Sequence, residues 1–161
     1  MSRIFLGAIL LTSLAHAQSD GDWLTYRNTP AGYEVAFPIK PAVQMIQPPK
    51  GSSVSAQLTS VKAEGLFMGI VFAPTVGKSQ ETFVAGLVNS FAKGGKILRQ
   101  DQIKFHNQPA EIVILHKGKS CMELLIFRRQ KGAVIALATA PSAKALGAKH
   151  FFQFFDSLKL L

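Results

Sequence analysis

The chain has 161 residues, a formal net charge of +9 and a single cysteine. Its length suits one domain that buries one hydrophobic core, and a lone cysteine excludes an intrachain disulfide. The basic balance favours an acidic protein, an acidic glycan or an anionic lipid headgroup as partner, attracted over long range and released by salt.

The first seventeen residues predict a removable secretory signal. Arg3 supplies a positive start, residues 4–14 form an apolar run, and Ala15-His16-Ala17 is a small-x-small cleavage site. This run is shorter than the roughly 20 residues of a membrane-spanning helix, no other run is long enough, and no cysteine follows Ala17 to carry a lipid. We therefore expect a signal peptide at 1–17 and a single soluble domain at 18–161, exported to the periplasm or beyond, where no specific nucleic-acid partner is expected.

Strands dominate the first half of the expected domain. Residues 20–28 predict a lead-in strand, and residues 32–37 alternate so that Tyr33, Val35 and Phe37 share one face. Residues 47–52 contain two prolines and a glycine and predict a loop. Two further strands are expected at 54–63 and 66–73, joined as a hairpin at Glu64-Gly65.

A change of hydrophobic period then predicts a helix. Ser79 is a suitable N-cap, Glu81 suits the positive first turn, and Lys93-Gly94-Gly95 ends the helix with a glycine for the left-handed cap. The apolar stripe recurs at spacings of three and four, which predicts that it faces the core. It consists of Phe83, Val84, Leu87, Val88 and Phe91.

The second half of the chain predicts an antiparallel meander followed by another helix. Strands are expected at 97–105, 110–116, 120–129 and 133–140, and short glycine-bearing links join the last three. Pro141-Ser142 opens the second helix, whose apolar stripe is expected to cover the sheet. That stripe consists of Ala148, Phe151, Phe152, Phe155 and Leu158.

In chain order these elements predict an α+β fold, with an antiparallel β-sheet of about six or seven strands covered by two α-helices. A parallel arrangement fits poorly, because most links between the strands are too short for crossover connections.

Five short segments follow one another in a suggestive order. They are residues 32–38 (GYEVAFP) with Lys40-Pro41, residues 66–74, residues 94–98 (GGKIL), residues 107–111 (NQPAE) and residues 155–160 (FDSLKL). In this order they resemble the PsbP-like fold superfamily, which includes small exported bacterial domains of unassigned function. Ala110 stands where related sequences often have glycine. The resemblance implies an antiparallel sheet sandwiched by helices and a role as an accessory or binding protein, and it brings no catalytic residue.

The sequence shows no catalytic or metal-binding constellation. After the signal the histidines are His106, His116 and His150, without an HExxH or CxxC motif or a pair at ligand spacing on one element. The nine acids stand in no recognisable motif. We therefore expect a protein that is not an enzyme and uses no cofactor.

One predicted hairpin brings a thiol and an imidazole together. If Gly118-Lys119 is a two-residue turn, Lys117 lies opposite Ser120 and His116 opposite Cys121. Such a pair can make a thiol reactive or supply two ligands to a soft metal. The alternative is that Cys121 is a small buried apolar residue and His116 a surface residue at the hairpin end.

Basic residues are concentrated between Lys93 and Lys131, where nine bases accompany three acids. Candidate anion contacts lie at both ends of one predicted strand: Lys117 and Lys119 at one end, and Arg128, Arg129 and Lys131 at the other. At about 3.3 Å per residue the two groups are roughly 25–30 Å apart, and adjacent arginines point to opposite faces. The two groups therefore predict two separate anion-binding patches rather than one pocket. The alternative is that these basic residues form an ordinary solvated surface without a specific partner.

Three functions remain open. The leading hypothesis is a non-enzymatic exported binding or accessory domain that engages an acidic partner or envelope surface through a basic edge. The second is a metal- or redox-active protein that uses Cys121 and His116. The third is an assembly subunit that exposes part of its phenylalanine content as an interface.

Overall fold

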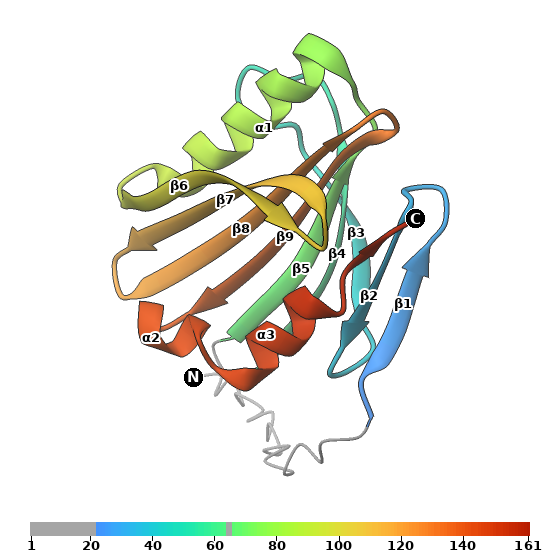
Figure 1. Ribbon diagram of the computed structural model, residues 1–161. Helices are drawn as coiled ribbons and strands as arrows, with labels where there is room; N and C mark the ends of the chain where they lie inside the picture. Colours follow the sequence, from blue (N-terminus) through green and yellow to red (C-terminus); the bar gives the residue numbers. More distant parts are fainter. Residues whose placement is uncertain (1–21, 64–65) are drawn as a thin grey trace, which may run out of the picture.

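The computed structural model describes residues 22–63 and 66–161, and the predicted signal peptide and the Glu64-Gly65 corner lie outside this range. Seven strands form the larger sheet (Figure 1). They are β3 (Ala42–Ile46), β4 (Ala56–Ala63), β5 (Leu66–Ala73), β6 (Lys96–Phe105), β7 (Gln108–Lys117), β8 (Ser120–Arg129) and β9 (Gly132–Ala140). Their order is β3-β4-β5-β9-β8-β7-β6, and every neighbouring pair is antiparallel. The predicted α+β class with an antiparallel sheet is confirmed.

A second, three-stranded sheet was not expected. It has the order β1-β2-β10, with β1 (Leu24–Asn28), β2 (Tyr33–Phe37) and β10 (Lys159–Leu160). Tyr33, Val35 and Phe37 are fully buried on one face, as their alternation predicted. That face packs on the same side of the core as helix α3 (Lys149–Asp156), where the rings of Phe37 and Phe154 lie 5.5 Å apart. This packing separates β1 and β2 from the larger sheet.

Helix α1 (Gly77–Ala92) covers one face of the larger sheet. Phe83, Val84, Leu87 and Val88 are buried, which confirms the predicted stripe. The predicted N-terminus was wrong, because the helix starts two residues before Ser79 and its N-cap, Val76, offers no side-chain hydrogen bond. Glu81 lies beyond the first turn and pairs instead with Arg128 of β8. Gly94 has a φ of 76°, the left-handed conformation expected at the end of the helix.

The predicted second helix is divided in two. Ser142 caps α2 (Ala143–Leu146) by accepting a hydrogen bond from the Ala145 amide, Gly147 ends it, and α3 (Lys149–Asp156) follows. The buried residues after this break are Phe151, Phe154, Phe155 and Leu158. Phe152, which the continuous stripe placed in the core, is 65% exposed.

The core has two layers, one on each face of the larger sheet. Alternate residues of the strands point to opposite faces, so Leu124 and Ile126 pack beneath α1 while Leu125 and Phe127 pack against the α3 side. Each fully buried large apolar side chain contributes roughly 1.5–3 kcal/mol. No helix within the described residues is both long and apolar enough to cross a membrane.

Strand β3 was also missed. Its first four residues, 42–45, are all exposed, so burial does not alternate along the strand and no period-two pattern marks it. It forms an edge of the larger sheet through pairing with β4 alone.

Candidate functional site

Four lysines gather at one corner of the larger sheet, where α1 ends. Gly95 brings the chain against the end of β7, and a Cβ on it would lie 2.5 Å from the His116 carbonyl oxygen, so only glycine permits this approach. β6 then starts at Lys96, directly opposite His116. The basic corner defined by these contacts consists of Lys93, Lys96, Lys117 and Lys119.

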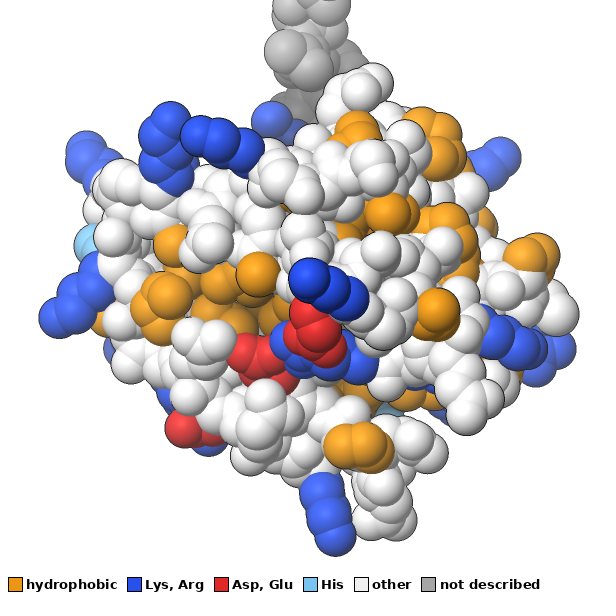
Figure 2. All heavy atoms as spheres, turned by 90° about the horizontal axis from the view of Figure 1, so that it is seen from above, with side chains coloured by type: hydrophobic (Ala, Val, Ile, Leu, Met, Phe, Trp, Pro, Cys, Tyr) orange, Lys and Arg blue, Asp and Glu red, His pale blue; other side chains and the backbone are white. Residues whose placement is uncertain are grey.

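The charges of the basic corner are not neutralised by neighbours. All four side chains are exposed, and among the described residues no carboxylate lies within 4.0 Å of them. By contrast, Arg27 and Lys159 both pair with Glu34. On the face that carries α1, acidic side chains are few, and those at the centre lie against lysine or arginine side chains, whereas most lysines and arginines stand around the outline (Figure 2). The corner therefore keeps a positive potential that attracts anions.

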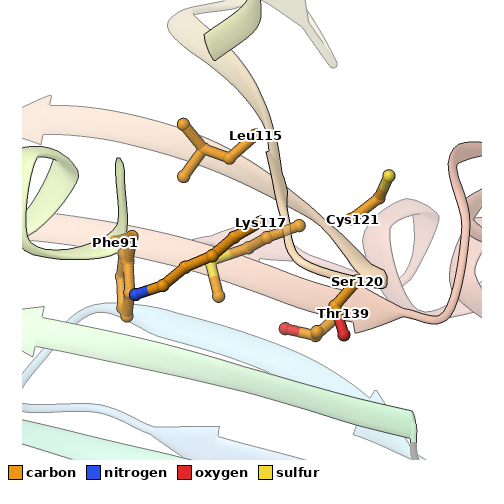
Figure 3. A pocket seen from close by; sticks show the side chains of 7 residues that line it. Phe91, Leu115, Lys117, Ser120, Cys121 and Thr139 are labelled. Atoms are coloured by element: carbon orange, nitrogen blue, oxygen red, sulfur yellow. The ribbon is translucent and has the colours of Figure 1, made fainter. Parts of the chain in front are cut away.

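A pocket of about 320 Å³ opens at this corner, on the α1 side of the sheet (Figure 3). Its lining consists of Phe91, Leu115, Lys117, Ser120, Cys121, Met122 and Thr139. In Figure 3 the Lys117 side chain extends towards the Phe91 ring, and the Cys121 thiol points away from Ser120 and Thr139. Apolar walls, one ammonium group and two hydroxyls suit an anionic group attached to an apolar body.

The predicted hairpin register is confirmed, with His116 opposite Cys121 and Lys117 opposite Ser120. The Cys121 side chain is 2% exposed and packs in the core layer on the α3 side, whereas His116 is exposed. Within the described part of the chain, no group of three or more His, Cys, Asp and Glu side chains could hold a metal ion. The pair offers two ligands, and its use in metal or redox chemistry stays a prediction.

Arg128 belongs to a polar cluster beneath α1 in which Glu111 is buried and Arg128 is partly exposed. Its Nη1 lies 2.7 Å from Oε2 of Glu111, whose side chain is 7% exposed, and its Nε lies 2.9 Å from Glu81. Gln100 donates a hydrogen bond of 2.6 Å to the other oxygen of Glu111. Burial alone would lower the pKa of the guanidinium, but its hydrogen bonds to Glu111 and Glu81 outweigh burial and raise that pKa. Arg128 thus satisfies a carboxylate that would otherwise be buried without a charge partner.

Arg129 points to the opposite face, as the strand geometry predicted. Its guanidinium donates hydrogen bonds of 2.6 Å to the backbone carbonyls of Gly32 and Leu161, which ties the two sheets together. Lys131 is exposed in the turn after β8. The ten residues of β8, about 30 Å at 3.3 Å per residue, separate these groups from Lys117 and Lys119. The anion-contact role of the second group stays a prediction, with both arginines engaged inside the domain.

Two acids in buried strands were not singled out from the sequence. Glu111 lies under α1, and Glu123 lines a groove on the other face of the sheet. Each interrupts an apolar run, in AEIVIL and CMELLIF respectively. A charge inside such a run is the signal that could have found them, because charged residues are rarely buried without a partner.

Comparisons with known proteins identify the fold through structure alone. No family model and no curated protein matches the sequence. The chain is similar to the solution structure of cyanobacterial PsbP (CyanoP) from Synechocystis sp. PCC 6803, with a TM-score of 0.62, 10% sequence identity, and 96% of this chain and 100% of that chain covered. A Pseudomonas aeruginosa protein of unknown function has a TM-score of 0.42 and 14% identity over 78% of this chain and 87% of its own, which is too low to carry an argument. The similarity to cyanobacterial PsbP shows that the chain has a PsbP-like fold.

Proposed function

We propose that this chain is an exported, non-enzymatic binding or accessory domain that engages an acidic partner or envelope surface through its basic corner. The observation that carries the proposal is the set of four exposed lysines without a carboxylate in reach among the described residues, one of which, Lys117, lines an apolar pocket. The predicted signal peptide and the accessory roles implied by the family resemblance support the same function.

Electrostatics favours an anion at this corner. Lys93 lies in the α1–β6 link, Lys96 is the first residue of β6, and Lys117 and Lys119 belong to the β7–β8 hairpin, so two separate chain segments deliver like charges to one place. Like charges repel within the screening length of about 8 Å at physiological ionic strength. A bound anionic surface relieves this repulsion and gains attraction to every ammonium group at once. The pocket adds an apolar contact that free counter-ions cannot use.

The test compares two variants that lose the same charge. K93Q/K96Q/K117Q/K119Q removes the basic corner, and K40Q/K50Q/K78Q/K104Q removes four exposed lysines elsewhere. Binding is measured by titration calorimetry against heparin, a poly-glutamate peptide and phosphatidylglycerol vesicles, at low and at physiological ionic strength. Each lysine at an anionic surface contributes about 1 kcal/mol, so the corner variant should bind at least about tenfold more weakly while the control stays near wild type.

The three probes distinguish an acidic glycan, an acidic protein and a lipid surface as the partner. Wild-type protein that binds none of them at low ionic strength would overturn the proposal. Equal losses in the two variants would also overturn it, because binding would then follow net charge rather than the corner.

A further inference from the structure

The groove that Glu123 lines lies on the opposite face of the larger sheet, between the strands and helices α2 and α3. It has a volume of about 250 Å³ and is lined by residues of β6, β7, β8 and both helices. Three rings, Phe105, Phe152 and Phe155, form its aromatic wall, and Ile112, Ile114 and Leu125 form its floor. Phe152 is 65% exposed, so an apolar ring stands in solvent at this recess.

Glu123 is the single ionisable residue in the lining of this groove. It lies opposite Ile114 of β7 and Ala138 of β9, so both of its cross-strand neighbours are apolar. None of the described residues forms a hydrogen bond or ion pair with it. Burial raises the pKa of the Glu123 carboxyl, and the positive charge of Arg99 opposes this only in part. A carboxylate in such surroundings lacks the partner that buried charges normally have.

The nearby charges leave the groove with a local negative charge. Arg99, the cation that acts on Glu123, has its Nε bonded to Asp101 on the same strand. The lining residues of α2 and α3 are uncharged. Arg99 and Asp101 therefore compensate each other, and the Glu123 carboxylate remains as the group that a ligand could neutralise.

We propose that this groove binds a small apolar primary amine, whose ammonium group pairs with Glu123 and whose hydrocarbon body lies against the aromatic wall. A volume of 250 Å³ corresponds to about eight water-sized volumes of 30 Å³, so the ligand has about eight to ten non-hydrogen atoms. An ammonium donates to the carboxylate beside apolar walls, and such charge-assisted bonds are stronger than bonds between neutral groups. This site is independent of the basic corner, from which it differs in face and in charge.

The experiment uses 2-phenylethylamine and two matched compounds, 2-phenylethanol and 3-phenylpropanoate. Affinities come from titrations of the isotope-labelled protein followed by amide chemical shifts, which detect millimolar binding and locate it. The amine should bind at least tenfold more tightly than the alcohol, and the carboxylate most weakly, with shifts in β7, β8 and α3. In Glu123→Gln the preference for the amine over the alcohol should fall to threefold or less.

Two further variants separate the charge from the apolar wall. Phe152→Ala removes an exposed ring and should weaken the amine and the alcohol by similar factors. Asp22→Asn removes an exposed acid that does not line the groove and should change neither affinity. Equal affinities of wild-type protein for amine and alcohol would overturn the proposal, as would an unchanged amine preference in Glu123→Gln. Amine shifts confined to residues outside the groove would do the same.

Discussion

Replacing Arg128 by methionine should cost the domain a large share of its stability. The Glu111 side chain is 7% exposed, and its Oε2 atom lies 2.7 Å from Arg128. Without the guanidinium, the single partner left to Glu111 among the described residues is Gln100, a neutral donor. Breaking a fully buried ion pair by removing one partner costs about 3–5 kcal/mol, because the other charge stays buried and unpaired. Here 30% of the Arg128 side chain is exposed and water screens the pair in part, so we expect the lower end of this range, about 3 kcal/mol.

That loss is large against a total stability of about 5–15 kcal/mol for a domain of ordinary size. At this chain length 1 kcal/mol shifts Tm by about 2–4 °C, so Arg128→Met should lower Tm by about 6–12 °C. Urea unfolding followed by circular dichroism measures the free energy, and an unchanged m-value shows that only stability has changed. Glu81→Gln is the matched control, because Glu81 is 59% exposed and its pair with Arg128 contributes about 1 kcal/mol or less.

The double variant Glu111→Leu/Arg128→Met tests the cause. It removes the buried Glu111 carboxylate together with its partner and should recover most of the loss, since such a pair can be replaced by apolar residues at little cost. Arg128→Met within about 1 kcal/mol of wild type would refute the conclusion that Arg128 stabilises the domain by pairing with Glu111. A double variant no more stable than Arg128→Met would refute it as well.

Two other predictions concern β8. Burial raises the pKa of the Glu123 carboxyl, so the folded state holds this proton more tightly than the unfolded state. The stability that comes from holding this proton is fully present below the unfolded pKa of about 4.3 and is lost as pH rises through the folded pKa. Glu123→Gln should therefore raise Tm near pH 8, by a margin that shrinks towards pH 4; a margin independent of pH would contradict this. The Cys121 thiol is 2% exposed and should not react with Ellman's reagent in the native protein but should react fully in urea. Fast reaction of the native thiol would instead favour the redox hypothesis for Cys121 and His116.

Local rules predicted those parts of the fold in which each residue's environment follows from its neighbours in sequence. Alternation located the buried face of β2, the helical period located the buried stripe of α1, and a two-residue turn at Gly118-Lys119 predicted that His116 faces Cys121. The order of landmarks predicted the PsbP-like fold, which the structural similarity confirms.

Features that depend on tertiary contacts were not predictable in the same way. Glu81 looked like a first-turn acid, but its partner is Arg128, forty-seven residues later. Phe152 looked buried because a continuous helix was assumed, and the break at Gly147 places Phe154 in the core instead. Both pockets draw their walls from helices and strands that are far apart in the sequence, so no single segment carries a signal for them.

Strand β8 is a wall shared by the two recesses. Met122 lines the pocket of the basic corner, and its neighbour Glu123 lines the groove on the other face. A spectroscopic change in the amides of these two residues would therefore report that a ligand has arrived without saying on which side. Phe91 lines only the first recess and Phe152 only the second. Fluorine labels on these two rings would give each site its own signal and would show whether both recesses can be occupied in one molecule.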